Sequence, residues 1–219
     1  MKSIIIGGGK VGYYLSKTLL ERNYDVSVIE KEKSVCQYFA NTLDVTVVLG
    51  DGSTAKALKK AGAEKCDSVI AVTGEDEVNL VICQMAKRLF GVEKTIAKVN
   101  NPKNVDTMRF LGVDIAISGT DNIIKQMERE VDNSRIKELM PINGKTAVFE
   151  VIIPENYVYD GKMIVDIKLP DGCNIISITR GEELIIPRGR TKLVSNDKLL
   201  IVSSISAANE VRKMLKIKK

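Results

Sequence analysis

The chain has 219 residues, of which 44% are hydrophobic and 28% charged, a composition typical of a folded protein with one large or two small domains. It contains no histidine, which excludes histidine-based acid–base catalysis, Ser-His and Cys-His nucleophile pairs and the commonest metal ligand. Its apolar runs are far shorter than the roughly 20 residues of a membrane span, and the net charge of +5 comes without the aromatic-studded basic stripe typical of nucleic-acid binding.

Four cysteines stand far apart in the chain, without a Cys-x-x-Cys pair: Cys36, Cys66, Cys83 and Cys173. This spacing favours buried, reduced thiols over a zinc site or a redox pair. The first predicted strand begins at Ser3 and runs straight into a glycine cluster, a start that does not resemble a secretory leader. We therefore expect a cytosolic protein that reaches a membrane only through a partner.

Short apolar segments alternate with amphipathic stretches up to about residue 118. We predict six strands, at Ser3–Ile6, Val26–Glu30, Val45–Leu49, Ser68–Val72, Thr95–Val99 and Asp114–Ile117. Near-continuous apolar strands separated by helices are typical of a parallel sheet that is covered on both faces. The sequence therefore predicts a doubly wound α/β domain with the strand order 3-2-1-4-5-6.

Helix start and stop signals lie between these strands. Ser53 is predicted to cap a helix that Gly62 closes. Asp76 is predicted to open a longer helix that Gly91 ends, with acidic residues in its first turn, where the helix dipole favours them.

The segment Thr120–Asn133 breaks this rhythm. Its apolar residues Ile123, Ile124, Met127 and Val131 form a helical stripe with no strand directly after it. Two interpretations stay open: the helix packs against its own domain, or it is exchanged or shared at a dimer interface.

The last third of the chain changes to short strands and turns. We predict strands at Ala147–Ile153, Asn174–Arg180, Leu184–Pro187 and Lys198–Ser203, and helices at Met163–Leu169 and Ala207–Leu215. A boundary is expected near Ile136–Asn143, where Pro141 and Gly144 interrupt the pattern. The predicted organisation is a doubly wound domain over residues 1–135 and a small α+β domain over residues 144–219.

The segment Gly7-Gly8-Gly9-Lys10-Val11-Gly12 fits the pattern G-x-G-x-x-G directly after the first predicted strand and at the start of a helix. In this context the pattern is typical of a Rossmann-type dinucleotide site. We assign the tight turn to Gly7, the close approach of a pyrophosphate to Gly9, and close helix–strand packing to Gly12. Free N–H groups at the helix N-terminus attract phosphate, and Lys10 adds positive charge.

Glu30 ends the second predicted strand. A carboxylate at this place accepts hydrogen bonds from the ribose hydroxyls of an adenosine and repels a 2′-phosphate, so NAD is favoured over NADP. The neighbouring Lys31 weakens that preference.

Three more segments follow predicted strand ends, where the ligands of such sheets bind. Gly50-Asp51-Gly52-Ser53 is expected near the adenine edge, and Val72-Thr73-Gly74 beside the phosphate loop. Lys98 is expected within reach of a phosphate.

Together these segments resemble the RCK family, also called KTN or TrkA-type, of cytosolic regulators of potassium channels and transporters. The similar stretches are Ile4–Gly12, Val28–Glu30, Gly50–Ser53, Ala71–Leu80 and Ala97–Pro102. Residues 147–204 are similar to the family's C-terminal TrkA-C domain, through Gly161-Lys162, Ile178-Thr179-Arg180 and Asn196-Asp197-Lys198-Leu199.

The resemblance implies a regulatory subunit rather than an enzyme. It implies that the first domain binds NAD(H) or an adenine nucleotide (ATP, ADP or AMP), and that ligand exchange gates potassium flux through a membrane channel or transporter. It also implies that two such domains pair, often within an octameric ring beneath the pore, so that the protein lies in the cytoplasm at the inner face of the membrane. No nucleic-acid partner is implied.

On these grounds we predict no catalytic residue and a nucleotide site formed by Gly7, Gly8, Gly9, Lys10, Val11, Gly12, Glu30, Lys31, Gly50, Asp51, Gly52, Ser53, Thr73, Gly74, Asn79 and Lys98. One departure from the family concerns metal binding. Many relatives carry a Pro-Glu pair after the sixth strand, whose carboxylate helps to bind a metal ion. Ser118-Gly119-Thr120-Asp121 stands there in this chain, so we predict no metal site.

An NAD-dependent oxidoreductase is the alternative function. Such an enzyme needs a proton donor beside the nicotinamide, and the second predicted domain offers only scattered groups such as Tyr159 and Lys162. A redox-sensing DNA-binding repressor needs a helix-turn-helix, and we predict no pair of short helices with a recognition face. The sequence therefore favours the ligand-sensing subunit.

Overall fold

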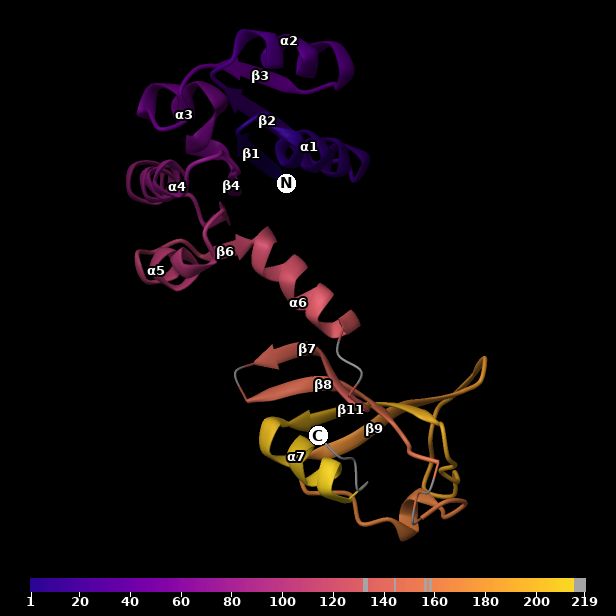
Figure 1. Cartoon of the computed structure of the whole chain (residues 1–219). Coiled ribbons are helices and arrows are strands. Elements are labelled where there is room, and N and C mark those ends of the chain that lie inside the picture. The colour runs from indigo at the N-terminus through magenta and orange to yellow at the C-terminus, as the bar shows by residue number, and fades with distance from the viewer. Residues whose placement is uncertain (132–133, 144, 156, 158, 215–219) are drawn as a thin grey trace. The chain divides into compact units, whose positions relative to one another are not determined.

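The computed structural model describes residues 1–131, 134–143, 145–155, 157 and 159–214. The chain divides into two compact units, Met1–Ile124 and Lys125–Lys219, and each unit has its own sheet (Figure 1). Among the described residues, no helix is both long enough and apolar enough to cross a membrane.

The first unit is built on a six-stranded sheet. Its strands are β1 Lys2–Ile6, β2 Asp25–Glu30, β3 Thr46–Leu49, β4 Ser68–Ala71, β5 Lys94–Val99 and β6 Ile115–Ser118. They pair in the order β3-β2-β1-β4-β5-β6, and every pair is parallel. The predicted doubly wound α/β fold and its strand order are confirmed.

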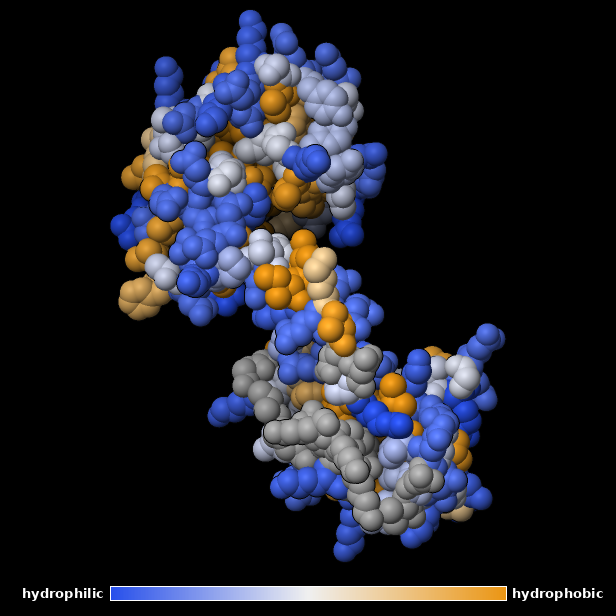
Figure 2. Space-filling model, in the orientation of Figure 1, coloured by the Kyte–Doolittle hydropathy of each residue, from blue (hydrophilic) through white to orange (hydrophobic). Residues whose placement is uncertain are grey.

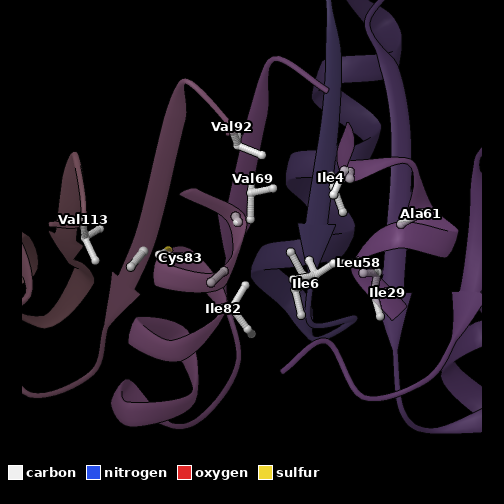
Figure 3. Packing of buried hydrophobic residues seen from close by; sticks show 14 of the residues in the cluster. Ile4, Ile6, Ile29, Leu58, Ala61, Val69, Ile82, Cys83, Val92 and Val113 are labelled. Carbon is white, nitrogen blue, oxygen red and sulfur yellow. The ribbon is translucent and has the colours of Figure 1, made fainter. Parts of the chain in front are cut away.

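Helices connect these strands and cover both faces of the sheet. They are α1 Lys10–Glu21, α2 Lys33–Thr42, α3 Ala55–Ala61, α4 Asp76–Phe90 and α5 Val105–Phe110, with the 3-10 turns η1 Ala63–Lys65 and η2 Pro102–Asn104. Successive side chains of β1 point to opposite faces. Ile5 therefore packs with Phe39 of α2 in one cluster. Ile4 and Ile6 pack with Leu58 of α3 in the other cluster, which Figure 3 shows.

The ends of the helices α3 and α4 follow the predicted signals in part. Gly62 and Gly91 are left-handed C-caps with φ of 92° and 66°, as expected for glycine. The N-cap of α3 is Thr54 and not Ser53. Ser53 instead donates both its N–H and its hydroxyl to the carboxylate of Asp51, because an ionised oxygen is the stronger acceptor.

The helix α6 spans Gly119–Val131, and none of its residues is buried in this chain. The predicted apolar stripe is exposed: the exposed fraction is 55% for Ile123, 54% for Ile124, 63% for Met127 and 80% for Val131. Figure 2 shows hydrophobic side chains gathered along α6. Both interpretations of this helix stay predictions.

The second unit contains a five-stranded antiparallel sheet. Its elements are β7 Ile136–Asn143, β8 Thr146–Ile152, the 3-10 turn η3 Ile164–Asp166, β9 Cys173–Arg180, β10 Glu183–Ile185, β11 Lys198–Ser204 and α7 Ile205–Met214. The strands pair in the order β10-β9-β11-β8-β7. Phe149, Ile178 and Ile201 from three of these strands share a core with Val211 of α7.

The strand β7 differs from the expectation of a boundary at residues 136–143. This segment pairs with β8 at the edge of the second sheet, with register shifts on both sides of Met140 and Pro141. An edge strand tolerates proline because one row of its N–H groups has no partner strand. Asn133 and Gly144, where we predicted a helix end and the start of the second domain, lie outside the described residues, as does the predicted helix end at Leu215.

The helix expected at Met163–Leu169 is only the short turn η3. Its backbone amides at Ile164 and Val165 donate across to the carbonyl groups of Thr191 and Gly189, both at 2.9 Å. The turn ends because the backbone of Ile167 is extended, with φ of −103° and ψ of 116°, so the local helical pattern does not continue to Leu169.

Candidate functional site

The glycine-rich loop joins β1 to α1, and its glycines are needed for different reasons. Gly7 has a φ of 109°, which favours glycine. A Cβ on Gly12 would lie 1.9 Å from the carbonyl oxygen of Gly7, so α1 can pass the end of β1 only with glycine there. Gly9 has a φ of −67°, and no described atom lies within 4 Å of an added Cβ. Neither backbone conformation nor packing requires glycine at position 9. Glycine there leaves open space above the backbone.

The helix α1 begins at Lys10, and its N-cap Gly9 offers no side chain to the first amides. An uncapped N-terminus presents N–H groups and the positive end of the helix dipole to an anion. Lys10 is exposed beside the same space and adds a formal positive charge.

Three backbone amides orient the carboxylate of Glu30 at the end of β2. Its Oε2 accepts a hydrogen bond from the N–H of Gly8 at 2.5 Å, and its Oε1 accepts from the N–H groups of Lys31 at 2.7 Å and Glu32 at 2.9 Å. A carboxylate has about four acceptor positions, so about one remains for another donor. The side chain is thus held against the glycine loop with capacity for a hydroxyl group.

Asp51 follows β3, and Ser53 in the same turn fixes its side chain. Its Oδ1 accepts from the N–H of Ser53 at 2.8 Å and from the hydroxyl of Ser53 at 2.7 Å. These two bonds, assisted by the charge of Lys31, hold the pKa of the Asp51 carboxyl below its ordinary value despite partial desolvation. Asp51 is therefore ionised at neutral pH.

Asn79 is fully buried in α4 and ties the ends of β4 and β5 together. Its Oδ1 accepts from the N–H of Thr73 at 3.0 Å and from the hydroxyl of Thr73 at 2.7 Å. Its Nδ2 donates to the carbonyl oxygen of Lys98 at 2.9 Å. The Lys98 ammonium in turn lies 3.5 Å from the carbonyl oxygen of Thr73. Asn79 therefore sets the relative position of Thr73 and Lys98.

These segments surround a cavity of about 610 Å³. It lies where the sheet order changes direction, beyond the carboxyl ends of β1 and β4, which is where ligands bind in such sheets. The predicted residues that line it are Gly7, Gly8, Gly9, Lys10, Val11, Glu30, Lys31, Gly50, Asp51, Gly52, Ser53, Thr73, Gly74 and Lys98. Gly12 and Asn79 do not line it: Gly12 packs under the loop and Asn79 is buried behind Thr73, so both shape the cavity from outside.

The sequence of the chain matches two domain families, the TrkA-N domain over residues 3–119 and the TrkA-C domain over residues 148–216. It is 30% identical over 223 residues to the Trk system potassium uptake protein TrkA of Mycobacterium tuberculosis, an alignment that covers 98% of each chain. The chain belongs to the TrkA family. A TrkA homolog 1 of Methanosarcina mazei is 35% identical over 216 residues, which are 97% of this chain and 48% of that relative. The chain thus spans about half the length of several curated TrkA relatives that it matches.

Solved structures share the fold of this TrkA-family chain. The GsuK channel bound to NAD superposes with a TM-score of 0.67 at 18% identity, over 98% of this chain and 39% of the channel chain. The Shewanella denitrificans Kef CTD in its AMP-bound form superposes with a TM-score of 0.52 at 20% identity, over 59% of this chain and 79% of that one. At these identities the likeness establishes the fold.

The cavity of this TrkA-family chain is also lined by residues that the sequence analysis did not single out, namely Ile6, Ile29, Glu75, Val78 and Ile82. Val78 and Ile82 are one helical turn apart on α4, and this i, i+4 spacing on a helix that starts at a strand end is a signal that identifies them. Ile6 and Ile29 carry no such signal, because an apolar residue at a strand end looks like any other core residue.

Acidic side chains and thiols are the candidate metal-binding and nucleophilic groups of the TrkA-N part. Among the residues that the structure describes, no three His, Cys, Asp or Glu side chains gather into a metal-binding group. The thiol of Cys36 donates to the carbonyl oxygen of Glu30 at 3.4 Å. Burial, together with the charge of Glu30, raises the pKa of Cys36, so the thiol stays protonated and is a poor nucleophile.

In the TrkA-C part, Arg180 and Asp197 form an ion pair between the end of β9 and the turn before β11. The Nε and Nη2 of Arg180 donate to the two carboxylate oxygens of Asp197 at 2.8 and 2.9 Å, and the N–H of Val194 adds a third bond at 2.9 Å. The side chain of Asp197 has an exposed fraction of 0%. A buried carboxylate with such a bidentate partner holds the fold of this unit together.

Proposed function

We propose that this protein is a regulatory subunit that senses NAD(H) or an adenine nucleotide and controls a membrane potassium channel or transporter. The observation that carries the proposal is the meeting of the glycine loop, the uncapped start of α1 and the carboxylate of Glu30 around one cavity. Backbone amides attract phosphates, and an oriented carboxylate accepts from ribose hydroxyls.

In the proposed complex a phosphate lies over Gly9 and the N-terminus of α1. The ribose of the adenosine donates to Glu30, and the adenine lies beside Asp51. Lys98 faces the remaining phosphates or the nicotinamide end. The cavity volume of about 610 Å³ is within the range of small-ligand sites, and the GsuK channel bound to NAD and the AMP-bound Kef CTD share this fold.

The potassium partner is proposed from the relatives, which are named Trk system potassium uptake proteins. A regulatory rather than an enzymatic role agrees with the chain's lack of histidine. In this role the protein works in the cytoplasm, at the inner face of the membrane, through its partner.

We propose that a second copy of the chain covers the exposed stripe of α6. This pairing is the proposed unit of a larger assembly, such as an octameric ring. The ligand then acts by population shift, because it moves the assembly only as far as it binds one arrangement better than the other. A tenfold preference contributes about 1.4 kcal/mol per site, and several sites in one ring add together.

The purified full chain tests this proposal. We expect mass spectrometry to find a co-purifying nucleotide, and calorimetry on the stripped protein to show binding of NAD⁺, NADH, AMP, ADP or ATP, with weaker binding of NADP⁺. A stripped protein that binds none of these nucleotides contradicts the proposal. Robust turnover of NADH over a panel of substrates would instead establish an oxidoreductase.

A further inference from the structure

Asp76, the first residue of α4, carries a nearly buried carboxylate, with an exposed fraction of 7%. Its Oδ1 accepts from the N–H and the Nδ2 of Asn100 at 2.7 and 2.9 Å. Its Oδ2 accepts from the N–H of Asn101 at 3.0 Å and from the Nδ2 of Asn104 at 2.8 Å. These four donors fill the roughly four acceptor positions of an ionised carboxylate.

The ionised form of Asp76 is favoured in the folded chain. Burial by itself raises the pKa of Asp76, but the backbone amides of Asn100 and Asn101 and the side chains of Asn104 and Asn100 outweigh it. The net result is a pKa below the ordinary value of an aspartate.

The same cluster reaches the wall of the cavity. The Nδ2 of Asn100 also donates to the carbonyl oxygen of Gly74 at 3.0 Å, and Gly74 lines the cavity. Residues 100–104 do not line the cavity themselves; they lead from β5 through η2 into α5. Asp76 thus stands between the ligand side of the turn after β4 and a segment that has no contact with that space.

We propose that Asp76 is a positioning residue that couples occupancy of the cavity to residues 100–104. The inference rests on the proposed nucleotide binding. A ligand that orders Gly74 also orders residues 100–104 through the shared hydrogen bonds. By reciprocity, a change that loosens residues 100–104 lowers the affinity for the ligand. The coupled segment continues into α5, which ends at Phe110 with an exposed fraction of 90%, so a change at the cavity is transmitted to the surface.

The variant Asp76→Asn keeps the size of the side chain and breaks its bonding pattern. Each carboxylate oxygen accepts from two N–H donors, so the amide NH₂ faces donors whichever way it is turned. Asp114→Asn is the matched control. Asp114 also accepts from a backbone N–H and a hydroxyl, both of Thr95 at 2.8 Å, and from the ammonium of Lys87, but it neither lines the cavity nor contacts Asp76.

Hydrogen exchange of the full chain with and without saturating NAD⁺ or AMP, followed by mass spectrometry, tests the coupling. In the wild type we expect the nucleotide to slow exchange both in the loop 7–12 and in residues 100–104. In Asp76→Asn we expect about a tenfold or greater loss of affinity, with protection kept in the loop 7–12 and lost in residues 100–104. Asp114→Asn should keep both the affinity and the two regions of protection.

Two results overturn the coupling alone. They are wild-type protection confined to the cavity lining, and an Asp76→Asn variant that binds as tightly as the wild type. If the wild type shows neither binding heat nor protection in the loop 7–12, the proposed function fails, and this inference fails with it. Should Asp76→Asn not fold, the exchange pattern of the wild type decides by itself. The double variant Asp76→Asn/Asn104→Asp, which restores one donor–acceptor pair, is then expected to regain folding and part of the affinity.

Discussion

The carboxylate of Glu30 accepts a hydrogen bond of 2.5 Å from the backbone N–H of Gly8, so the end of β2 and the loop after β1 form one structural unit. The parallel register of β1 and β2 pairs Ile6 with Ile29, and this pairing brings Glu30 beside the loop that follows Ile6. A Cβ on Gly8 would lie 2.6 Å from Cγ1 of Val35 and 3.0 Å from Oε2 of Glu30, so glycine at this position leaves room for both side chains. The acid thus shapes the loop as well as offering an acceptor to a ribose.

Replacing Glu30 by alanine is expected to lower the affinity for NAD⁺ or AMP by about ten- to a hundredfold, because hydrogen bonds to an ionised acceptor contribute about 1.5–3 kcal/mol. Calorimetry on the purified variant measures this loss. Glu32→Ala is the control, since Glu32 is an exposed neighbour that does not line the cavity and keeps its backbone amide. Equal affinities of Glu30→Ala and the wild type would remove the ribose role.

Gly9→Ala separates the needs of a ligand from the needs of the fold. The added methyl group meets no described atom within 4 Å and fits a φ of −67°, so the free energy of unfolding should change by no more than about 0.5 kcal/mol. The same methyl group stands where the phosphate is proposed, so the affinity for nucleotide should fall at least about tenfold. Thermal unfolding measures the change in stability, and calorimetry measures the change in affinity for nucleotide.

Gly12→Ala is the contrasting variant of the loop. Its Cβ would lie 1.9 Å from the carbonyl oxygen of Gly7, so we expect a loss of about 3 kcal/mol in stability whether or not a nucleotide is present. If both alanine variants lose stability to the same extent, the assignment of separate roles to these glycines is wrong.

Met127→Glu tests the pairing of two chains through α6. A charge in the middle of the exposed apolar stripe should not disturb the fold of either unit, because no residue of α6 is buried in this chain. It should move the protein from dimer or larger assembly to monomer in light scattering at micromolar concentration. Gln126→Glu adds the same charge on the same helix away from the stripe and is expected to leave the assembly unchanged.

Arg180→Ala leaves the carboxylate of Asp197 buried without its cation. We expect a loss of about 3 kcal/mol in the stability of the second unit, since breaking one half of a buried pair costs more than the pair contributes. Hydrogen exchange resolved along the chain measures this loss of stability. We expect faster exchange in β9 and β11 and an unchanged exchange rate in the first unit. The double variant Arg180→Ala/Asp197→Asn should recover part of the loss; a double variant as unstable as the single one argues against the charge as the cause.

The acid stability of the first unit should depend on Asp76. Its pKa is lower in the folded chain than in the unfolded chain, so between the two values the unfolded chain binds more protons and stability rises with pH. The stabilisation is fully present above the ordinary aspartate pKa of about 3.9 and is lost as the pH falls through the lower pKa of the folded chain. Asp76→Asn should be less stable at neutral pH and show a shallower acid transition by circular dichroism. An unchanged slope would mean that other carboxylates control acid unfolding.

Most of the candidate site followed from local signals. The residues at strand ends, such as Thr73 and Lys98, were recognisable because parallel strands bring their carboxyl ends to one edge. Asn79 and Gly12 were predicted among the site residues but do not line the cavity, whereas the packing role predicted for Gly12 agrees with the 1.9 Å that would separate its Cβ from the carbonyl oxygen of Gly7. An asparagine offers the same hydrogen-bonding groups whether it lines a cavity or lies behind its wall. Only the tertiary structure shows that Asn79 is buried and that its side-chain amide is already bonded to Thr73.

The sequence by itself determined the doubly wound sheet, its strand order and the glycine loop, because hydrophobic period and glycine spacing act within a few residues of chain. Only the tertiary structure decided that Glu30 is held by Gly8, that Asp76 gathers the asparagines of residues 100–104, and that residues 136–143 form a strand. These relationships depend on which distant segments meet, and a hydrogen bond between residues far apart in the chain leaves no periodic trace in the sequence.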